Sequence, residues 1–551
     1  MVARPRRRRA AVQAPLIAGA TTLQGRRIPL EPPAHLTYTA RKSRKCLISG
    51  CCKLKYYHHT ALLIALGTLT LSAAPAAAQQ VPSGDDDAST VAAPTEASKE
   101  ETDLGAAAET TGEFLFGSYG RAQFELDGEG NDGAAQNIVS HGPRLFQEDY
   151  AEFDFSYTLE KPDGFTSQVL FTFALFGPFA HYDGDFLDQP MAVRNLYVRM
   201  ANLSQALDGL SLWAGSRMYR GDDIYLLDWW PLDELNTVGG GLAYRKHGFD
   251  GRLHLGVNRL DNDYQLQVIE VPSTPFGTRP KVLLDRQRLL GSGRFEYAAT
   301  DLVARWGAKG VLYGEYHRLP EGQRIPQEFI QDGAPTRPEA EVLETLPSDD
   351  GFVLGAELGL FESETTNHLN LFFRYSRGLA AFGEFGVPFG TALDGTSGDA
   401  EEILGALSGN WESQYFGVMA GAYLRKFTDA DTNTSDLDEF VEGTAVVRPA
   451  IYVTDHFHQA FEVSYQRRYP FGLDPDTGEF EDPQVWQLSV LELLSLGRGN
   501  YARPQIRLGY TVAFANDAAR NEYPVGDTRR PEDVEHIVSV GAEWWFNSST
   551  Y

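Results

Sequence analysis

Cysteine, methionine and long apolar runs are scarce in this chain of 551 residues. Its three cysteines are Cys46, Cys51 and Cys52, and it has only five methionines. One stretch alone is apolar enough for a membrane helix, and the mean hydropathy is −0.31, so a polytopic helical membrane protein is excluded. Basic residues are also in deficit, with 48 Lys+Arg against 75 Asp+Glu and a formal net charge of −27. This balance argues against a nucleic-acid binder, which needs a basic face.

Enzyme signatures are missing as well. The sequence has no HExxH, no GxSxG and no GxGxxG leading from a strand into a helix. We therefore expect neither an enzyme nor a bound cofactor. A barrel hydrolase is the remaining enzymatic alternative, and a lipid or peptide hydrolysis assay tests it.

The single apolar stretch, TALLIALGTLTLSAAPAAA, runs from Thr60 to Ala78 and follows the basic run KLKYYHHT. A basic segment, an apolar core and a small-residue end are typical of a secretory signal peptide. A single-pass anchor is the alternative, but the core is short and ends in Ala and Pro. We expect residues 1–78, an N-terminal extension plus signal peptide, to be removed, so that the mature chain begins at or near Gln79. Whether translation starts at Met1 or near Leu54 stays open.

The mature chain is strongly acidic and contains no cysteine. Residues 1–78 hold 13 of the Lys+Arg and 1 of the Asp+Glu, which leaves 35 against 74 and a net charge of −39. Disulfides therefore cannot stabilise the exported protein. Residues 79–112 are rich in Ala, Ser, Thr, Asp and Glu and cannot bury enough apolar surface to fold alone, so we expect an acidic disordered linker.

From Glu113 onward, apolar and polar residues alternate in segments of about ten residues. In FLFGSYGRAQFE, residues 114–125, the apolar residues fall mainly on even positions and the polar ones on odd positions. Residues 150–157 and 503–512 repeat this alternation. A period of two predicts half-exposed strands. A soluble sandwich has the same period, but here one face is rich in Phe and Tyr and the other carries full charges.

The C-terminus favours a membrane barrel over a sandwich. In VGAEWWF, residues 540–546, apolar side chains alternate and end in aromatics, which resembles the terminal strand of bacterial outer-membrane barrels. Backbone groups in lipid must all be paired, so such a chain has to close on itself. We predict an all-β fold, a transmembrane antiparallel β-barrel over residues 113–546 with a tail at 547–551. That length supplies roughly 14 to 20 strands and leaves an aqueous lumen.

One run carries a family resemblance. LWAGSRMYRGDDIYLLDWW, starting at Leu212, is similar to the third-loop region of the maltoporin-like carbohydrate porins, and GGGLAYR after it resembles their Gly-rich return. FGSYGR, RLFQEDYAEF and DFLDQPMAVR match earlier segments in the same order. The resemblance implies about 18 strands, long extracellular loops with one folded into the lumen, a homotrimer, and contact with outer-membrane lipid in the bacterial cell outer membrane. It also implies passive diffusion of carbohydrates and small ions. A general or otherwise specific porin, or a barrel receptor or adhesin, is the alternative.

Sugars present apolar ring faces and a fringe of hydroxyls, so a transport path needs aromatic rings and hydrogen-bonding charges. The resemblance implies an aromatic slide. Strand parity places Tyr119, Tyr150 and Trp545 on the charged, lumenal face. The alternative is that these rings belong to an aromatic girdle at the membrane interface. The slide candidates are Tyr119, Tyr150, Phe186, Trp230 and Trp545.

A polar track is implied beside the slide. Arginine offers a planar fork of donors to neighbouring hydroxyls, and carboxylates accept from them. Equally, these charges can form a network that holds the third loop in place. By alternation Arg194 shares a face with apolar residues, so it needs a β-bulge to turn inward. The track candidates are Arg121, Arg144, Glu152, Arg194, Arg220, Asp223 and Asp228.

The sequence departs from the family in the expected constriction. The family's arginine falls at Gly221, with Arg220 one residue earlier, and its tyrosine falls at Trp230. Two mid-pore aromatics have no clear match, and Phe352 and Phe372 are the substitutes. A bulkier ring and a shifted arginine alter width and selectivity, so a maltodextrin preference does not carry over. The acidic charge favours cations, and acidic loops can take up divalent cations.

Overall fold

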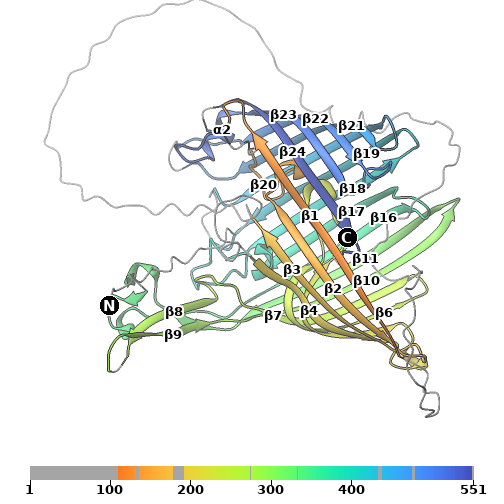
Figure 1. The fold of residues 1–551 in the computed structure, drawn as a ribbon. Helices are drawn as coiled ribbons and strands as arrows, with labels where there is room; N and C mark the ends of the chain where they lie inside the picture. Colours follow the sequence, from red (N-terminus) through yellow and green to blue (C-terminus); the bar gives the residue numbers. More distant parts are fainter. Residues whose placement is uncertain are drawn as a thin grey trace, which may run out of the picture. The chain divides into compact units, whose positions relative to one another are not determined.

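The computed structural model describes residues 110–548 apart from 132, 134–135, 178–190, 274, 332, 432–436, 475–477 and 531. Within them, eighteen antiparallel strands form one sheet, and its last strand pairs with its first (Figure 1). This pairing closes the sheet into a barrel and confirms the predicted fold. The barrel strands are β1 (Thr111–Leu126), β2 (Tyr150–Glu160), β3 (Thr166–Phe176), β4 (Met191–Ala201), β5 (Leu210–Arg220), β6 (Glu234–Lys246), β7 (Phe249–Asn258), β10 (Arg288–Val303), β11 (Trp306–Leu319), β16 (Asp349–Glu362), β17 (His368–Gly378), β18 (Glu401–Glu412), β19 (Phe416–Thr428), β20 (Phe440–Tyr452), β21 (Phe457–Pro470), β22 (Gln484–Ser495), β23 (Gln505–Ala515) and β24 (Val534–Phe546).

Short turns and long loops lie at opposite ends of the barrel. The turn between β6 and β7 is only His247 and Gly248, both with positive φ (53° and 80°), which is the backbone twist that a two-residue hairpin requires. Connections at the other end are longer, such as 221–233 and 379–400. Short periplasmic turns and long extracellular loops are the rule in outer-membrane barrels, so the long loops mark the extracellular end.

Alternation within the strands separates a lipid-facing surface from a lumenal one. In β19, Leu424 is 63% exposed, whereas its neighbour Tyr423 is 4% exposed. Strand β1 follows the predicted parity, since Phe114 and Phe124 face outward and Tyr119 faces inward. Apolar side chains therefore meet lipid, and polar side chains line the interior.

Shorter elements lie in the long loops. They comprise the hairpin β8 (Leu266–Pro272) and β9 (Thr278–Asp285), the short strands β12 (Gly322–Arg324), β13 (Ile330–Gln331), β14 (Ala334–Pro335) and β15 (Glu344–Leu346), and the helices α1 (Glu339–Val342) and α2 (Asp517–Asn521). Single turns of 3-10 helix are η1 (Arg144–Phe146), η4 (Tyr225–Leu227), η5 (Gln327–Phe329) and η6 (Leu379–Phe382); η3 (Gln205–Leu207) belongs to a periplasmic turn. No helix in the described part of the chain is long and apolar enough to cross a membrane.

Candidate functional site: the lumenal loop and its walls

Residues 221–233, between β5 and β6, leave the wall and lie in the lumen. The loop is closed at its base by the Gly221 amide, which donates to the Asp233 carbonyl (3.0 Å), and at its tip by a bridge between Ile224 and Trp229. Pro231 cannot donate to a strand ladder, which agrees with its place outside the sheet. The predicted inward loop is confirmed, and it sets which side chains border the lumen at this level.

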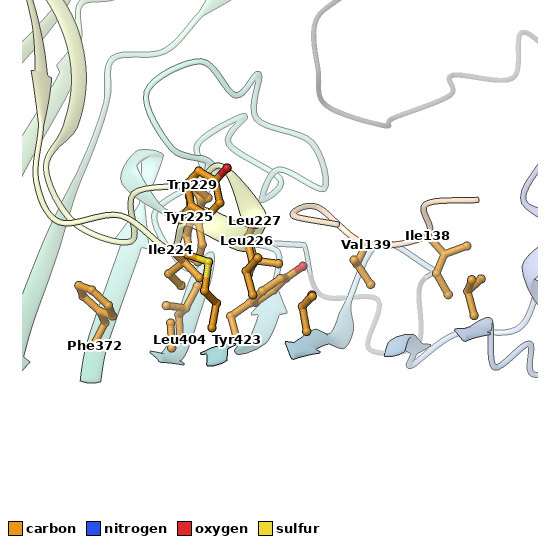
Figure 2. Close-up of a cluster of buried hydrophobic side chains, with 14 of the residues drawn as sticks. Ile138, Val139, Ile224, Tyr225, Leu226, Leu227, Trp229, Phe372, Leu404 and Tyr423 are labelled. Carbon is orange, nitrogen blue, oxygen red and sulfur yellow. The ribbon is translucent and has the colours of Figure 1, made fainter. Parts of the chain in front are cut away.

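Apolar side chains fix this loop to the far wall. Ile224, Leu226 and Leu227 are at most 3% exposed and belong to one buried cluster with inward-facing residues of β17 to β19. Figure 2 shows these loop side chains lying over Tyr423 and Leu404. The wall is close enough that a Cβ on Gly421 would lie 2.7 Å from the Ile224 methyl, so this position requires glycine.

Charged side chains connect this loop to β1 and to the loop between β1 and β2. Asp228 accepts a hydrogen bond from Arg121 Nη1 at 2.9 Å, and Arg144 Nη1 lies 3.4 Å from its other oxygen. Arg144 also donates to Glu543 at 2.5 Å. Glu543 in turn lies 2.8 Å from Arg503. Charge-assisted bonds of this kind hold a loop firmly, because removing one partner leaves a poorly solvated charge.

Five of the predicted slide and track residues meet at one place. Tyr119 and Tyr150 are in ring contact, with centroids 5.7 Å apart, and the Arg121 guanidinium lies 5.4 Å from the Tyr150 ring. Tyr119 is only 2% exposed, and its hydroxyl bonds to Arg121 and Arg144. Tyr150 is half-buried and bonds through its hydroxyl to Glu152. Tyr150 is thus the more exposed of the two contacting rings, and Tyr119, which packs against it, is almost fully covered.

Arg194 turns inward through an irregularity in β4. The pairing with β3 shifts between Thr172 and Phe173, which pair with Asn195 and Val193, so Arg194 is the extra residue of a bulge. Its guanidinium lies 5.9 Å from the Tyr150 ring, and its Nε is 4.0 Å from Glu152. The bulge that the alternation required is therefore present.

The two adjacent tryptophans of the loop have different surroundings. Trp229 is 3% exposed and stacks on His141 at 3.9 Å, so it anchors the loop. Trp230 is half-buried, and the Arg220 guanidinium lies 4.8 Å from its ring. Trp230 is thus the more exposed of the two tryptophans, and the predicted partners Trp230 and Arg220 are in contact.

The two neighbouring carboxylates at the start of the loop, Asp222 and Asp223, differ in their ion pairs and therefore in their pKa values. Asp222 pairs with Arg294 (2.9 Å) and Lys309 (2.6 Å), and these cations hold its pKa far below the usual value against the effect of burial. Burial raises the pKa of Asp223 to about 7, with smaller rises from Asp228 and Asp222, while Arg144 opposes the shift. Asp222 therefore pins the loop, and Asp223 is a group that titrates near neutral pH.

Trp545 lies on the same side of the barrel as the charged network. It is half-buried, the Arg503 guanidinium is 4.4 Å from its ring, and the Tyr225 ring is 6.1 Å away. Its inward orientation agrees with the parity that pairs it with Tyr119 across β1 and β24.

Several lumenal residues escaped the sequence analysis. Glu543 and Tyr225 complete the network around Arg144 and Arg503, and the Tyr225 hydroxyl donates to Glu543 at 2.8 Å. The inward parity of Glu543 was visible in VGAEWWF, but its partners come from distant segments. A second charge chain follows β17 to β20, where Arg374, Glu402, Arg425 and Glu442 pair in sequence.

The remaining aromatic candidates, Phe186, Phe352 and Phe372, have different outcomes. Phe186 lies outside the described residues. Phe372 is 4% exposed and packs with the loop, but Phe352 is 36% exposed on the outward side of β16, so the interpretation of Phe352 as a mid-pore ring is wrong. Among residues 110–548 that are described, no group of three acidic, His or Cys side chains is placed to hold a metal ion.

A closed barrel with one loop folded into a charged and aromatic lumen defines a porin of the bacterial outer membrane. The LamB porin model matches residues 114–546, most of the chain. The chain belongs to the LamB porin family.

The chain is also similar to curated relatives and to solved structures. Maltoporins of two Vibrio cholerae serotype O1 strains are each 23% identical over 447 residues, which is 78% of this chain and 94% or 93% of theirs. Among solved structures, OpdK of Pseudomonas aeruginosa with vanillate is 12% identical, covers 79% of this chain and 98% of its own, and has a TM-score of 0.37. OmpT of Vibrio cholerae in its trimer form is 11% identical with a TM-score of 0.34, covering 79% and 99%.

Proposed function

We propose that this porin carries out passive, facilitated diffusion of carbohydrates, maltodextrin-like or other oligosaccharides, together with small ions. The observation that carries the proposal is the grouping around Tyr150. Its half-buried ring is bordered by two guanidiniums, of Arg121 and Arg194, and its hydroxyl bonds to Glu152. A ring face beside donors and an acceptor is what a sugar ring with its hydroxyl fringe requires.

The charges near this ring are largely paired, which suits a neutral solute. Arg121 pairs with Asp228, and Arg144 with Glu543. A sugar hydroxyl can exchange hydrogen bonds with such pairs without removing a net charge from water. Weak, repeated contacts of this kind let a solute bind and also leave, as diffusion through a pore demands.

Trp230 with Arg220, and Trp545 with Arg503, repeat the combination of ring and guanidinium at two further points. We propose these, with Tyr150 and the supporting Tyr119, as the slide, and Arg144, Asp223 and Asp228 as further members of the polar track. Assembly as a homotrimer, removal of residues 1–78 and a linker role for 79–112 belong to the same proposal.

The test is planar-bilayer conductance with a panel of mono- and oligosaccharides. We expect concentration-dependent block of the ion current by oligosaccharides and a steeper dependence for longer ones. Ion current without block by any sugar would favour a general porin, and absence of an open channel would favour a receptor or adhesin. A matched recording of Tyr150→Ala links any block to the proposed grouping.

A further inference from the structure

Arg217 on β5 faces the lumen above a group of three aromatic rings. Its guanidinium carbon lies 4.9 Å from the Tyr197 ring, 5.3 Å from the Trp213 ring and 4.6 Å from the Tyr219 ring. Trp213 and Tyr219 share its strand face, since all three occupy odd positions of β5. The flat cation is therefore held against an aromatic floor, a geometry that aligns it without using its N–H donors.

The rings themselves are closed to a solute. Tyr197, Trp213 and Tyr219 are 8%, 5% and 3% exposed, and the Trp213 indole N–H donates to the Tyr219 hydroxyl at 2.7 Å. His254 stacks on Trp213, with centroids 5.7 Å apart. No sugar face can reach these rings, whereas Arg217 as a whole residue is half-buried, so Arg217 is the member of this group that a solute can approach.

Neighbouring cations make direct ion pairs, whereas Arg217 interacts with the buried Asp233 carboxylate electrostatically, without a salt bridge or a hydrogen bond to it. Arg252 pairs with Asp250 at 2.8 Å, and Arg294 pairs with Asp222 at 2.9 Å. Within the described part of the chain, Arg217 makes neither an ion pair nor a hydrogen bond through its side chain, and its contacts are the three rings. Its five donors are thus available, and their planar fork matches the two oxygens of a carboxylate.

The position of Arg217 places it just past the lumenal loop. Strand β5 runs from the short-turn end to the loop and ends at Arg220, so Arg217 lies three residues, or about 10 Å, toward the periplasmic end. A solute that passes Trp230 and Arg220 would meet Arg217 next.

We propose that Arg217 forms a subsite for the carboxylate of an acidic saccharide, a uronate, on the periplasmic side of the loop. The inference rests on the proposed function, because it adds a subsite for an acidic sugar to a lumen whose charges near Tyr150 are largely paired. The aromatic floor fixes the orientation of the guanidinium, and the uronate carboxylate supplies the direct ion pair that Arg217 does not make within the protein.

The test compares block of single channels by trigalacturonate and by the neutral trisaccharide maltotriose. Arg217→Gln should weaken trigalacturonate block at least tenfold and change maltotriose block less than twofold. Arg217→Lys keeps the charge but loses the planar fork, so it should fall between wild type and Arg217→Gln. Arg305→Gln is the matched control, because it removes one positive charge at a periplasmic turn, where Arg305 pairs with Glu362 and Glu364; it should alter neither block.

Equal loss of block by both sugars, or no change in either, in Arg217→Gln channels would overturn the subsite. If neither sugar blocks the wild-type channel, the proposed function fails, and the subsite is then judged by the reversal potential in a gradient of sodium galacturonate. Arg217→Gln should shift that potential toward cation selectivity, and an unchanged potential would refute the subsite. Heat-modifiable migration on SDS gels checks that each variant folds. If Arg217→Gln does not fold, sugar block and reversal potential are both measured on Arg217→Lys instead.

Discussion

The Asp228 carboxylate, on the loop in the lumen, accepts a 2.9 Å hydrogen bond from Arg121 of the first barrel strand. The two residues are 107 positions apart in the sequence, so this bond joins the loop tip to the strand that closes the barrel. Both side chains keep about 15% exposure, which leaves the pair in reach of passing ions.

Asp228→Asn should lower cation preference. The substitution removes a negative charge and leaves Arg121 with an amide partner, while Arg144 keeps Glu543. We expect the reversal potential in a potassium chloride gradient to move toward anions. Asp208→Asn is the control, because Asp208 lies in a periplasmic turn, is 63% exposed and pairs with Lys246. An equal shift in both variants would remove Asp228 from the ion path.

Tyr150→Ala should weaken sugar block more than Tyr119→Ala does. Tyr150 presents a half-buried ring, whereas Tyr119 is almost fully covered and contributes through Arg121 and Arg144. Loss of one stacking face costs about 1 kcal/mol, or roughly a fivefold weaker block. Titration of the ion current with sugar measures both variants. Unchanged block in both would assign these rings to the barrel's structure alone.

Trp230→Ala should raise single-channel conductance, while Trp229→Ala should mainly loosen the loop. We propose that Trp230 borders the lumen beside Arg220, and on that proposal its removal widens the passage. Trp229 is buried against His141 and Tyr423, and truncating a buried tryptophan costs about 3–5 kcal/mol. Conductance histograms and thermal unfolding in detergent separate the two effects. Similar conductance in Trp230→Ala and wild type would place the steric limit elsewhere.

Cation selectivity should rise as pH passes through about 7. Burial raises the pKa of Asp223 to about 7, so this carboxyl is neutral below that pH and adds a negative charge to the lumen above it. The raised pKa means that the folded protein favours the neutral Asp223 carboxyl. The contribution of this carboxyl to the free energy of unfolding is therefore full below about pH 4 and is lost as the pH rises through 7. Reversal potentials between pH 5 and 9 should show this step in wild type and lose it in Asp223→Asn.

A second buried carboxyl provides the control for this titration. Burial raises the pKa of Glu384, on the loop between β17 and β18, to about 8, and its oxygens accept from Asn236 and Asn258. Glu384→Gln should leave the step near pH 7 in place. A step that disappears in Glu384→Gln and persists in Asp223→Asn would assign the titration to Glu384 instead.

The barrel could be predicted from short sequence patterns, because the alternation of lipid-facing and lumen-facing side chains is a property of each strand by itself. Parity alone placed Tyr119, Tyr150 and Trp545 inward, and the alternation also showed that Arg194 required a bulge. The partners of Asp228 and Glu543 could not be read in this way, since Arg121 and Arg144 lie 107 and 399 positions away from them in the sequence. The same holds for the burial of Tyr119, which depends on how the loops fill the lumen rather than on its strand.

Gly421→Val tests where the loop rests. A Cβ at this position would lie 2.7 Å from the Ile224 methyl, which is closer than real contacts allow, and 3.4 Å from Leu226, so the loop must shift away from β19. Overpacking of this kind costs about 1–3 kcal/mol and pushes the loop toward the side lined by Tyr150. We expect lower single-channel conductance and a lower unfolding temperature. Gly405→Val is the matched control, because Gly405 faces outward on β18 with no atom within 4 Å of its added Cβ, and it should behave as wild type. Wild-type conductance and stability in Gly421→Val would show that the loop does not rest on β19, and the assignment of Trp230 to the passage would then lose its support.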